Sequence, residues 1–160
     1  MNDYPVYVGG MFMHKIFGTK MQTNYIDREG AYLVAVRDNR IAMIKTAKGY
    51  FLPGGGKEKD ETDEECIIRE CLEETGGIAE VIYYLCTAEA YMEHPNLGFF
   101  HPIQNYYFGN LSEQAQDKME TDHELLWLEY EEIKGKMFVE MQEWALEIFL
   151  QQNYISCIDR

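Results

Sequence analysis

Three glutamates that lie close together in the sequence, Glu70, Glu73 and Glu74, are the residues of this chain best suited to chemistry. If residues 62–75 form a helix, a step of about 100° per residue places Glu73 roughly 60° to one side of Glu70 and Glu74 roughly 40° to the other. Three carboxylates on one patch repel one another unless a cation lies between them. Their hard oxygen atoms suit Mg²⁺, with Mn²⁺ as a substitute, because these ions bind carboxylates, waters and substrate phosphates. The pattern therefore predicts a divalent-cation site on one face of a helix.

The flanking residues predict how this helix begins and which of its faces is buried. Thr62 followed by Glu65 is typical of a capping box. Residues 53–56 (Pro-Gly-Gly-Gly) predict a turn that permits positive φ angles and lets backbone groups approach a metal or a phosphate. Arg69 lies beside the acidic face, where its planar fork can pair with Glu61. We expect the buried face to lie about 160° from Glu70, on the side of three apolar residues: Ile68, Cys71 and Leu72.

The stretch from residue 55 to residue 77 resembles the Nudix box. That motif consists of Gly, five residues, Glu, seven residues, Arg-Glu, an aliphatic residue, any residue, Glu-Glu, any residue, Gly and an aliphatic residue. The chain matches it with the required spacing at Gly55, Glu61, Arg69, Glu70, Glu73, Glu74 and Gly76. Cys71 and Gly77 stand where aliphatic residues are usual. These two departures affect packing and leave the acids intact.

The resemblance implies an activity and a set of roles. Members of this family hydrolyse a nucleoside diphosphate linked to another group, with Mg²⁺ as cofactor and water attacking a phosphorus atom. A nucleoside triphosphate, a nucleotide sugar and a dinucleotide polyphosphate all stay open as substrates. Carried over position by position, the metal ligands are the carboxylates of Glu70, Glu73 and Glu74 and the carbonyl of Gly54. Glu61 and Arg69 would support them. The general base stays open among Glu70, Glu120, Asp122 and Glu124.

Composition limits the partners of this protein. At 160 residues, with 46% hydrophobic residues, the chain is long enough for one domain with its own core. A net charge of −14 argues against a nucleic-acid polymer, but a small nucleotide is compatible because bound cations can reverse the local field. No apolar run approaches the roughly 20 residues of a membrane span, and we see no signal peptide. The four cysteines show no close C-x-x-C pair, so we expect free thiols in the cytoplasm.

Hydrophobic patterning predicts the elements that hold the motif. We expect strands over residues 31–36, 40–45, 50–52, 79–91, 99–108 and 124–129. We expect helices over residues 62–75 and 138–151, and a short helical turn that starts at residue 131. This order predicts an α/β fold with a mixed sheet, antiparallel pairs included, between helices. The Nudix family has such an α/β/α sandwich. We expect the Nudix domain to span residues 29–152, after an N-terminal arm or edge strands (1–28) and before a C-terminal tail (153–160). A monomer and a homodimer fit equally well.

Substrate recognition is the least determined part of the sequence. Nucleobases stack on aromatic rings, and the candidates for binding the substrate are Tyr91, His94, Phe99 and His101. Alternatively, each ring belongs to the core or to a strand pair, and each histidine caps a turn. A second hypothesis for function is a Nudix domain without catalysis that senses a nucleotide or binds a partner, although such domains usually lose an acid of the motif. A calcium-binding or purely structural acidic domain is a third, but the chain lacks the alternating oxygen ligands of an EF-hand loop.

Overall fold

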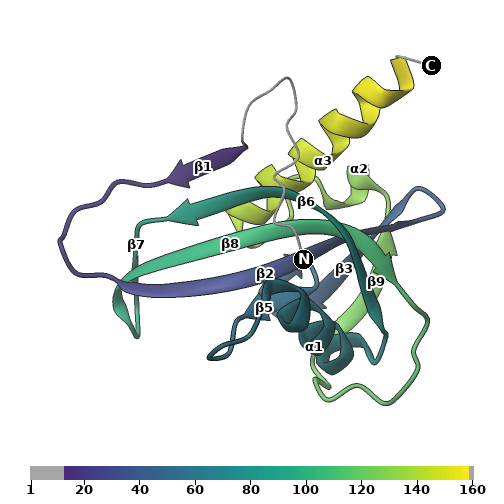
Figure 1. The fold of residues 1–160 in the computed structure, drawn as a ribbon, viewed down its shortest axis with the longest axis horizontal. Helices are drawn as coiled ribbons and strands as arrows, with labels where there is room; N and C mark the ends of the chain where they lie inside the picture. The colour runs from purple at the N-terminus through teal and green to yellow at the C-terminus, as the bar shows by residue number, and fades with distance from the viewer. Residues whose placement is uncertain (1–12, 159–160) are drawn as a thin grey trace.

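The structure, a computed structural model, describes residues 13–158, with the side chains described up to residue 153 (Figure 1). The first part of the expected N-terminal arm, residues 1–12, therefore lies outside the described residues. The described part of that arm contains an edge strand, β1 (His14–Phe17), which pairs in parallel with β6 (Ala79–Ala90). No described helix is long and apolar enough to cross a membrane.

A mixed sheet forms the centre of the described chain. Its strand order is β1-β6-β8-β2-β3-β4, with β5 beside β2, β7 beside β8 and β9 beside β3. The pairs β1–β6 and β2–β8 are parallel and the remaining pairs are antiparallel. The other strands are β2 (Ile26–Arg37), β3 (Arg40–Thr46), β4 (Gly49–Phe51), β5 (Gly54–Gly56), β7 (Met92–His94), β8 (Gly98–Leu111) and β9 (Glu124–Leu128).

Helices cover both faces of this sheet (Figure 1). Helix α1 (Asp63–Thr75) lies on one face, and α2 (Tyr130–Ile133) and α3 (Glu140–Ile158) lie on the other. Successive side chains of β2 point to opposite faces of the sheet, so the strand contributes to both cores. Leu33 belongs to the buried cluster under α1, and Val34 belongs to the cluster under α3. The expected α/β/α sandwich with a mixed sheet is confirmed.

Strand β2, helix α3 and strand β5 differ from the sequence prediction. Strand β2 begins at Ile26 instead of residue 31, because its first half pairs with β8 through polar residues that carry no apolar alternation. Helix α3 continues to Ile158, beyond the predicted end at 151. The glycines expected only as a turn form strand β5, which pairs antiparallel with residues 30–32 of β2. The glycine segment is therefore held rigidly in the sheet.

The prediction for the buried face of α1 is confirmed at Cys71 and wrong at Ile68. Ile68 is 37% exposed, whereas the buried residues of the helix are Cys66, Ile67, Cys71, Glu74 and Thr75. The buried face is therefore centred near Ile67 and includes Glu74, which the sequence placed on the open side. The reason is that β5 consists of three glycines. With no side chains in the way, the helix packs its carboxylates directly against the strand backbone.

Candidate active site

Both ends of α1 are fixed by the residues that the sequence singled out. Thr62 is the N-cap: its side chain accepts a hydrogen bond from the Glu65 amide, and the Glu65 carboxylate accepts one from the Thr62 amide. The predicted capping box is confirmed. At the other end Gly76 adopts a left-handed conformation, with φ of 72°, and its amide donates to the Leu72 carbonyl. A Cβ on Gly76 would overlap the Gln116 carbonyl, so a glycine here lets the following loop cross the helix end.

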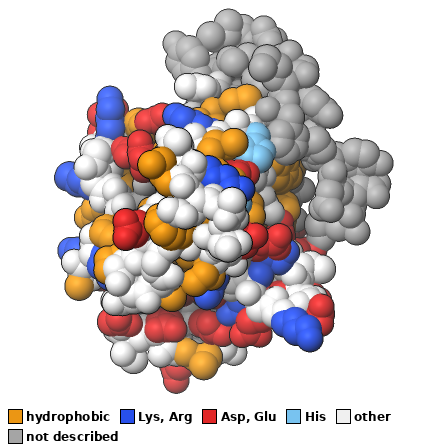
Figure 2. Space-filling model, turned by 90° about the vertical axis from the view of Figure 1, so that its left-hand side faces the viewer, with side chains coloured by type: hydrophobic (Ala, Val, Ile, Leu, Met, Phe, Trp, Pro, Cys, Tyr) orange, Lys and Arg blue, Asp and Glu red, His pale blue; other side chains and the backbone are white. Residues whose placement is uncertain are grey.

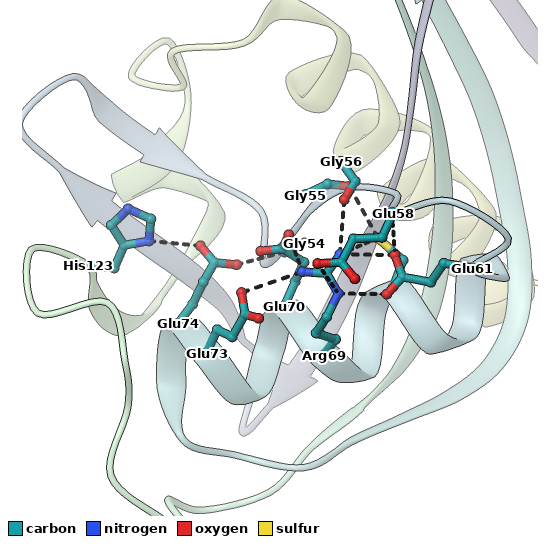
Figure 3. A network of polar contacts seen from close by, with 11 residues as sticks. Gly54, Gly55, Gly56, Glu58, Glu61, Arg69, Glu70, Glu73, Glu74 and His123 are labelled. Carbon is teal, nitrogen blue, oxygen red and sulfur yellow. Dashed lines mark hydrogen bonds and ion pairs between the residues drawn. The ribbon is translucent and has the colours of Figure 1, made fainter.

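Glu74, which Figure 3 shows between Gly54 and His123, is the most buried acid of the site. Its side chain is 6% exposed. One carboxylate oxygen accepts from the Gly54 amide at 3.0 Å, and the other contacts His123 Nδ1 at 3.0 Å. Burial raises the pKa of Glu74 to about 8, the Gly54 hydrogen bond opposes this shift, and the carboxylate of Glu70 adds to it. Because burial disfavours the negative charge of Glu74, a nearby cation would stabilise this carboxylate more than it would stabilise an exposed one.

The raised pKa of Glu74 predicts a pH dependence of stability in protein stripped of metal. The unfolded chain releases this proton near the ordinary pKa of 4.5, but the folded chain retains it up to about pH 8. The free energy of unfolding should therefore fall as pH rises between these values. Glutamine cannot titrate, so Glu74→Gln should weaken this slope. Melting temperatures measured in EDTA at about pH 5 and about pH 8 check the prediction, and equal slopes for wild type and variant would contradict it.

Glu70 lies in a space that a glycine leaves open. A Cβ built on Gly55 would lie 2.5 Å from the carboxyl carbon of Glu70, so any larger residue would displace this carboxylate. Burial raises the pKa of Glu70, and the hydrogen bond from Arg69 opposes that shift. Glu70 and Glu74 thus meet two successive glycines of β5, which gives strand and helix a joint role in the site.

Arg69 pairs with three acids of the site, Glu61, Glu70 and Glu73 (Figure 3). Its Nε and Nη2 donate to the two oxygens of Glu61, at 2.6 and 3.0 Å. The pairing of Arg69 with Glu61 predicted from the sequence is therefore present, and it lowers the pKa of Glu61 to about 2. Nη1 reaches Glu70 at 2.9 Å and Glu73 at 3.5 Å, and Nη2 also donates to the Gly56 carbonyl at 3.0 Å. A single guanidinium thus joins loop, strand and helix.

These residues fit a divalent cation. The group offers hard carboxylate oxygens from Glu70, Glu73 and Glu74 next to the backbone of Gly54. Mg²⁺ and Mn²⁺ favour such ligands. Two further observations fit a cation site. Glu74 is a buried acid, and the absence of a side chain at Gly55 leaves space for the carboxylate of Glu70.

The loop after β8 brings further ionisable groups to the same place. Glu120 and Asp122, two of the predicted outer bases, lie with His123 so that one ligand atom from each falls within 4.8 Å of the others. The amides of Met119 and Glu120 donate to the Glu73 carbonyl at 2.9 and 3.0 Å. Glu124, the third candidate, begins β9 opposite Lys45. Sequence reasoning missed His123, whose only signal was its place between the candidate acids.

Three of the four predicted substrate-binding residues gather at the β7 end of the sheet. Tyr91 stacks on His101 with ring centroids 4.4 Å apart, and Tyr25, which was not predicted, contacts both Tyr91 (5.1 Å) and Phe99 (5.6 Å). Figure 2 shows this end of the molecule, where hydrophobic side chains are exposed between acidic and basic ones. His94 stands apart from this group, since its Nδ1 accepts the Asn96 amide within the following turn.

A pocket of about 410 Å³ lies between this aromatic group and the acids. It is lined by residues 27–29 of β2 and 57–61 of the loop before α1. Its basic side chains are Arg28, Lys57 and Lys59, and its acidic side chains are Asp27, Glu29, Glu58, Asp60 and Glu61. At one end Asp27 contacts His101 Nδ1 at 2.8 Å, and at the other Glu61 contacts Arg69. Two of the lining residues, Asp27 and Glu61, thus contact His101 of the aromatic group and Arg69 of the acidic site.

Comparisons with known proteins agree with this geometry. The NUDIX domain model matches residues 26–149. Among similar solved structures, a NUDIX hydrolase from Nitrosomonas europaea has a TM-score of 0.68 at 18% identity, with 79% of this chain and 90% of that chain covered. A MutT NUDIX hydrolase from Burkholderia pseudomallei has a TM-score of 0.63 at 28% identity, with 76% and 97% covered.

A third similar structure contains a ligand. The NUDIX domain of Shewanella oneidensis NrtR, complexed with ADP ribose, has a TM-score of 0.61 at 17% identity, with 85% of this chain and 93% of that chain covered. No curated protein matches the chain. The chain belongs to the NUDIX family, and its fold and intact acidic motif class it with the hydrolases of that family.

Proposed function

We propose that this protein hydrolyses the pyrophosphate bond of a nucleoside diphosphate linked to another group, with Mg²⁺ as cofactor and water attacking phosphorus. The observation that carries the proposal is the position of Glu70 and Glu74 against the glycines of β5. Glu70, Glu73, Glu74 and the Gly54 carbonyl would hold the cation. When bound, such cations neutralise the phosphate oxygens and lower the pKa of an attacking water.

The residues of the chain itself contribute positioning. Arg69 fixes the carboxylate of Glu70 from one side through Nη1 and anchors the loop of Glu61 through its other two nitrogens. Phosphoryl transfer depends chiefly on positioning and charge neutralisation, so this rigidity serves the reaction. For the general base we propose Glu120 or Asp122 ahead of Glu70, because Glu70 is already engaged by Arg69 while the loop acids lie beside His123.

The pocket beside the acids suits the rest of the substrate. The pocket is lined by three cations, Arg28, Lys57 and Lys59, and by five acids, and Lys57 pairs with Asp63 at 2.9 Å. Phosphate oxygens of a substrate would meet the cations, and a bound divalent ion would offset the acids. Phe99, which is 36% exposed beside Tyr25, offers an apolar face on which a base or sugar can pack, whereas Tyr91 already stacks on His101. We propose a small nucleotide as substrate, and the NrtR relative complexed with ADP ribose makes ADP-ribose the first compound to test. Buried free thiols at Cys66, Cys71 and Cys86 support a cytoplasmic location.

A panel of nucleotides tests the proposed function. ADP-ribose, nucleotide sugars, nucleoside triphosphates and dinucleotide polyphosphates are incubated with the protein and Mg²⁺ or Mn²⁺, and products are separated by chromatography. We expect at least one compound to be cleaved at its pyrophosphate, because the motif retains all its acids. Binding of a compound without cleavage of any would support a sensing domain instead. If Glu120→Gln hydrolyses the substrate at a rate within about twofold of wild type, Glu120 is not the general base, and Asp122 and Glu70 stay as the candidates.

A further inference from the structure

His123 contacts the acidic site from a distant part of the chain. It lies at the end of the loop between β8 and β9, 49 residues after Glu74, and its Nδ1 is 3.0 Å from Glu74 Oε2. The His123 side chain is 26% exposed, whereas that of Glu74 is 6% exposed. The imidazole therefore lies between solvent and the most buried carboxylate of the site (Figure 3).

This contact completes the set of partners that fix the glutamates. Arg69 donates to Glu70 and Glu73. Glu74 instead accepts from the Gly54 amide on one oxygen and meets His123 on the other. A carboxylate with both oxygens held cannot rotate freely, so its direction toward Glu70 depends on His123 as much as on β5.

The loop that carries His123 is anchored independently of the imidazole. The amides of Ala115 and Gln116 donate to the Gly76 carbonyl, and those of Met119 and Glu120 donate to the Glu73 carbonyl. Strand β9 follows at once and pairs with β3. A substitution at position 123 should therefore leave the path of the backbone unchanged. It removes the contact with Glu74 and a longer one, of 3.9 Å, between Nε2 and the exposed Asp122.

We propose that His123 is a positioning residue of the cation site, which orients the carboxylate of Glu74 through an Nδ1–H donor. This inference rests on the proposed function, since it takes Glu74 to be a metal ligand. Residues that orient metal ligands commonly change metal affinity by about 10–100-fold when they are replaced. His123 acts on Glu74, and its effect should appear in cation affinity before any substrate is added.

Mn²⁺ binding to protein without nucleotide, followed by electron paramagnetic resonance, tests this inference. His123→Leu removes the donor, and we expect the Mn²⁺ dissociation constant to rise about 10–100-fold. Asparagine can place an N–H near the position of Nδ1, so His123→Asn should stay within about threefold of wild type. His14→Leu is the matched control, because it removes a histidine–carboxylate pair of 2.8 Å between His14 on β1 and Glu89 on β6.

The outcomes separate this inference from the proposed function. If wild type binds no Mn²⁺, the proposed function fails. If wild type binds Mn²⁺ and His123→Leu binds it within about threefold as tightly, only the role of His123 is overturned. His123→Ala replaces the leucine variant if the latter does not fold, as judged by its melting temperature. A His123→Asn variant as weak as His123→Leu would also overturn the role of a donor.

Discussion

Glu74→Gln should lower Mg²⁺-dependent hydrolysis by at least about a hundredfold while the protein stays folded. Glutamine keeps the shape of the side chain and can still accept the Gly54 amide, which lies 3.0 Å from Glu74 Oε1. It loses the negative charge that a divalent cation requires. Because burial already disfavours that charge, the substitution should not destabilise metal-free protein near neutral pH.

The rate is measured with the best substrate of the panel at saturating Mg²⁺, and the melting temperature reports folding. Glu64→Gln on the first turn of the same helix is the control, since it changes the charge of α1 equally. Glu73→Gln should also lose most activity, because Glu73 faces the same group of acids (Figure 3). A Glu74→Gln rate within about threefold of wild type would contradict the role of Glu74 as a ligand.

Arg69→Leu should produce the largest loss of stability among the changes at this site. It leaves the carboxylates of Glu61 and Glu70, whose side chains are 10% and 19% exposed, without the guanidinium that pairs with them. Breaking a buried ion pair on one side costs about 3–5 kcal/mol, and partial exposure here lowers that to about 2–4 kcal/mol. For a chain of this size the melting temperature should fall by roughly 5–15 °C.

Arg69→Lys tests whether the shape of the guanidinium matters beyond its charge. A lysine can pair with one acid but cannot donate in parallel to both oxygens of Glu61, so it should recover less than half of the lost stability. Arg40→Leu, at the exposed first residue of β3, is the control for loss of a cation. Thermal unfolding followed by circular dichroism gives the melting temperature of all three variants. A decrease of less than about 2 °C for Arg69→Leu would refute the stabilising role of Arg69.

Local signals allowed the helix and its acids to be predicted from the sequence. The cap at Thr62, the end at Gly76 and the pairing of Arg69 with Glu61 each depend on residues close in sequence. Helical spacing also placed Glu70, Glu73 and Glu74 on one patch, as the structure shows (Figure 3). Such features need only the geometry of one helix and one turn.

Features that depend on tertiary packing could not be predicted. The buried face of α1 was placed wrongly at Ile68 because the pairing of β5 with β2, which creates a side-chain-free wall, has no sequence signal beyond the glycines. His123 reaches Glu74 across 49 residues through a loop without periodic pattern. The same limit applies to Tyr25, which meets Tyr91 because β2 begins and β6 ends at the same end of the sheet.

Mg²⁺ titration of protein stripped with EDTA is the sharpest test of the claim that hydrolysis requires a divalent cation at the glutamates. With the best nucleotide of the panel, we expect background hydrolysis in EDTA and a saturable return of activity as Mg²⁺ is added, with Mn²⁺ able to replace it. Pyrophosphate cleavage that continues undiminished in EDTA would contradict the claim. So would a folded protein that cleaves no nucleotide of the panel at any Mg²⁺ concentration.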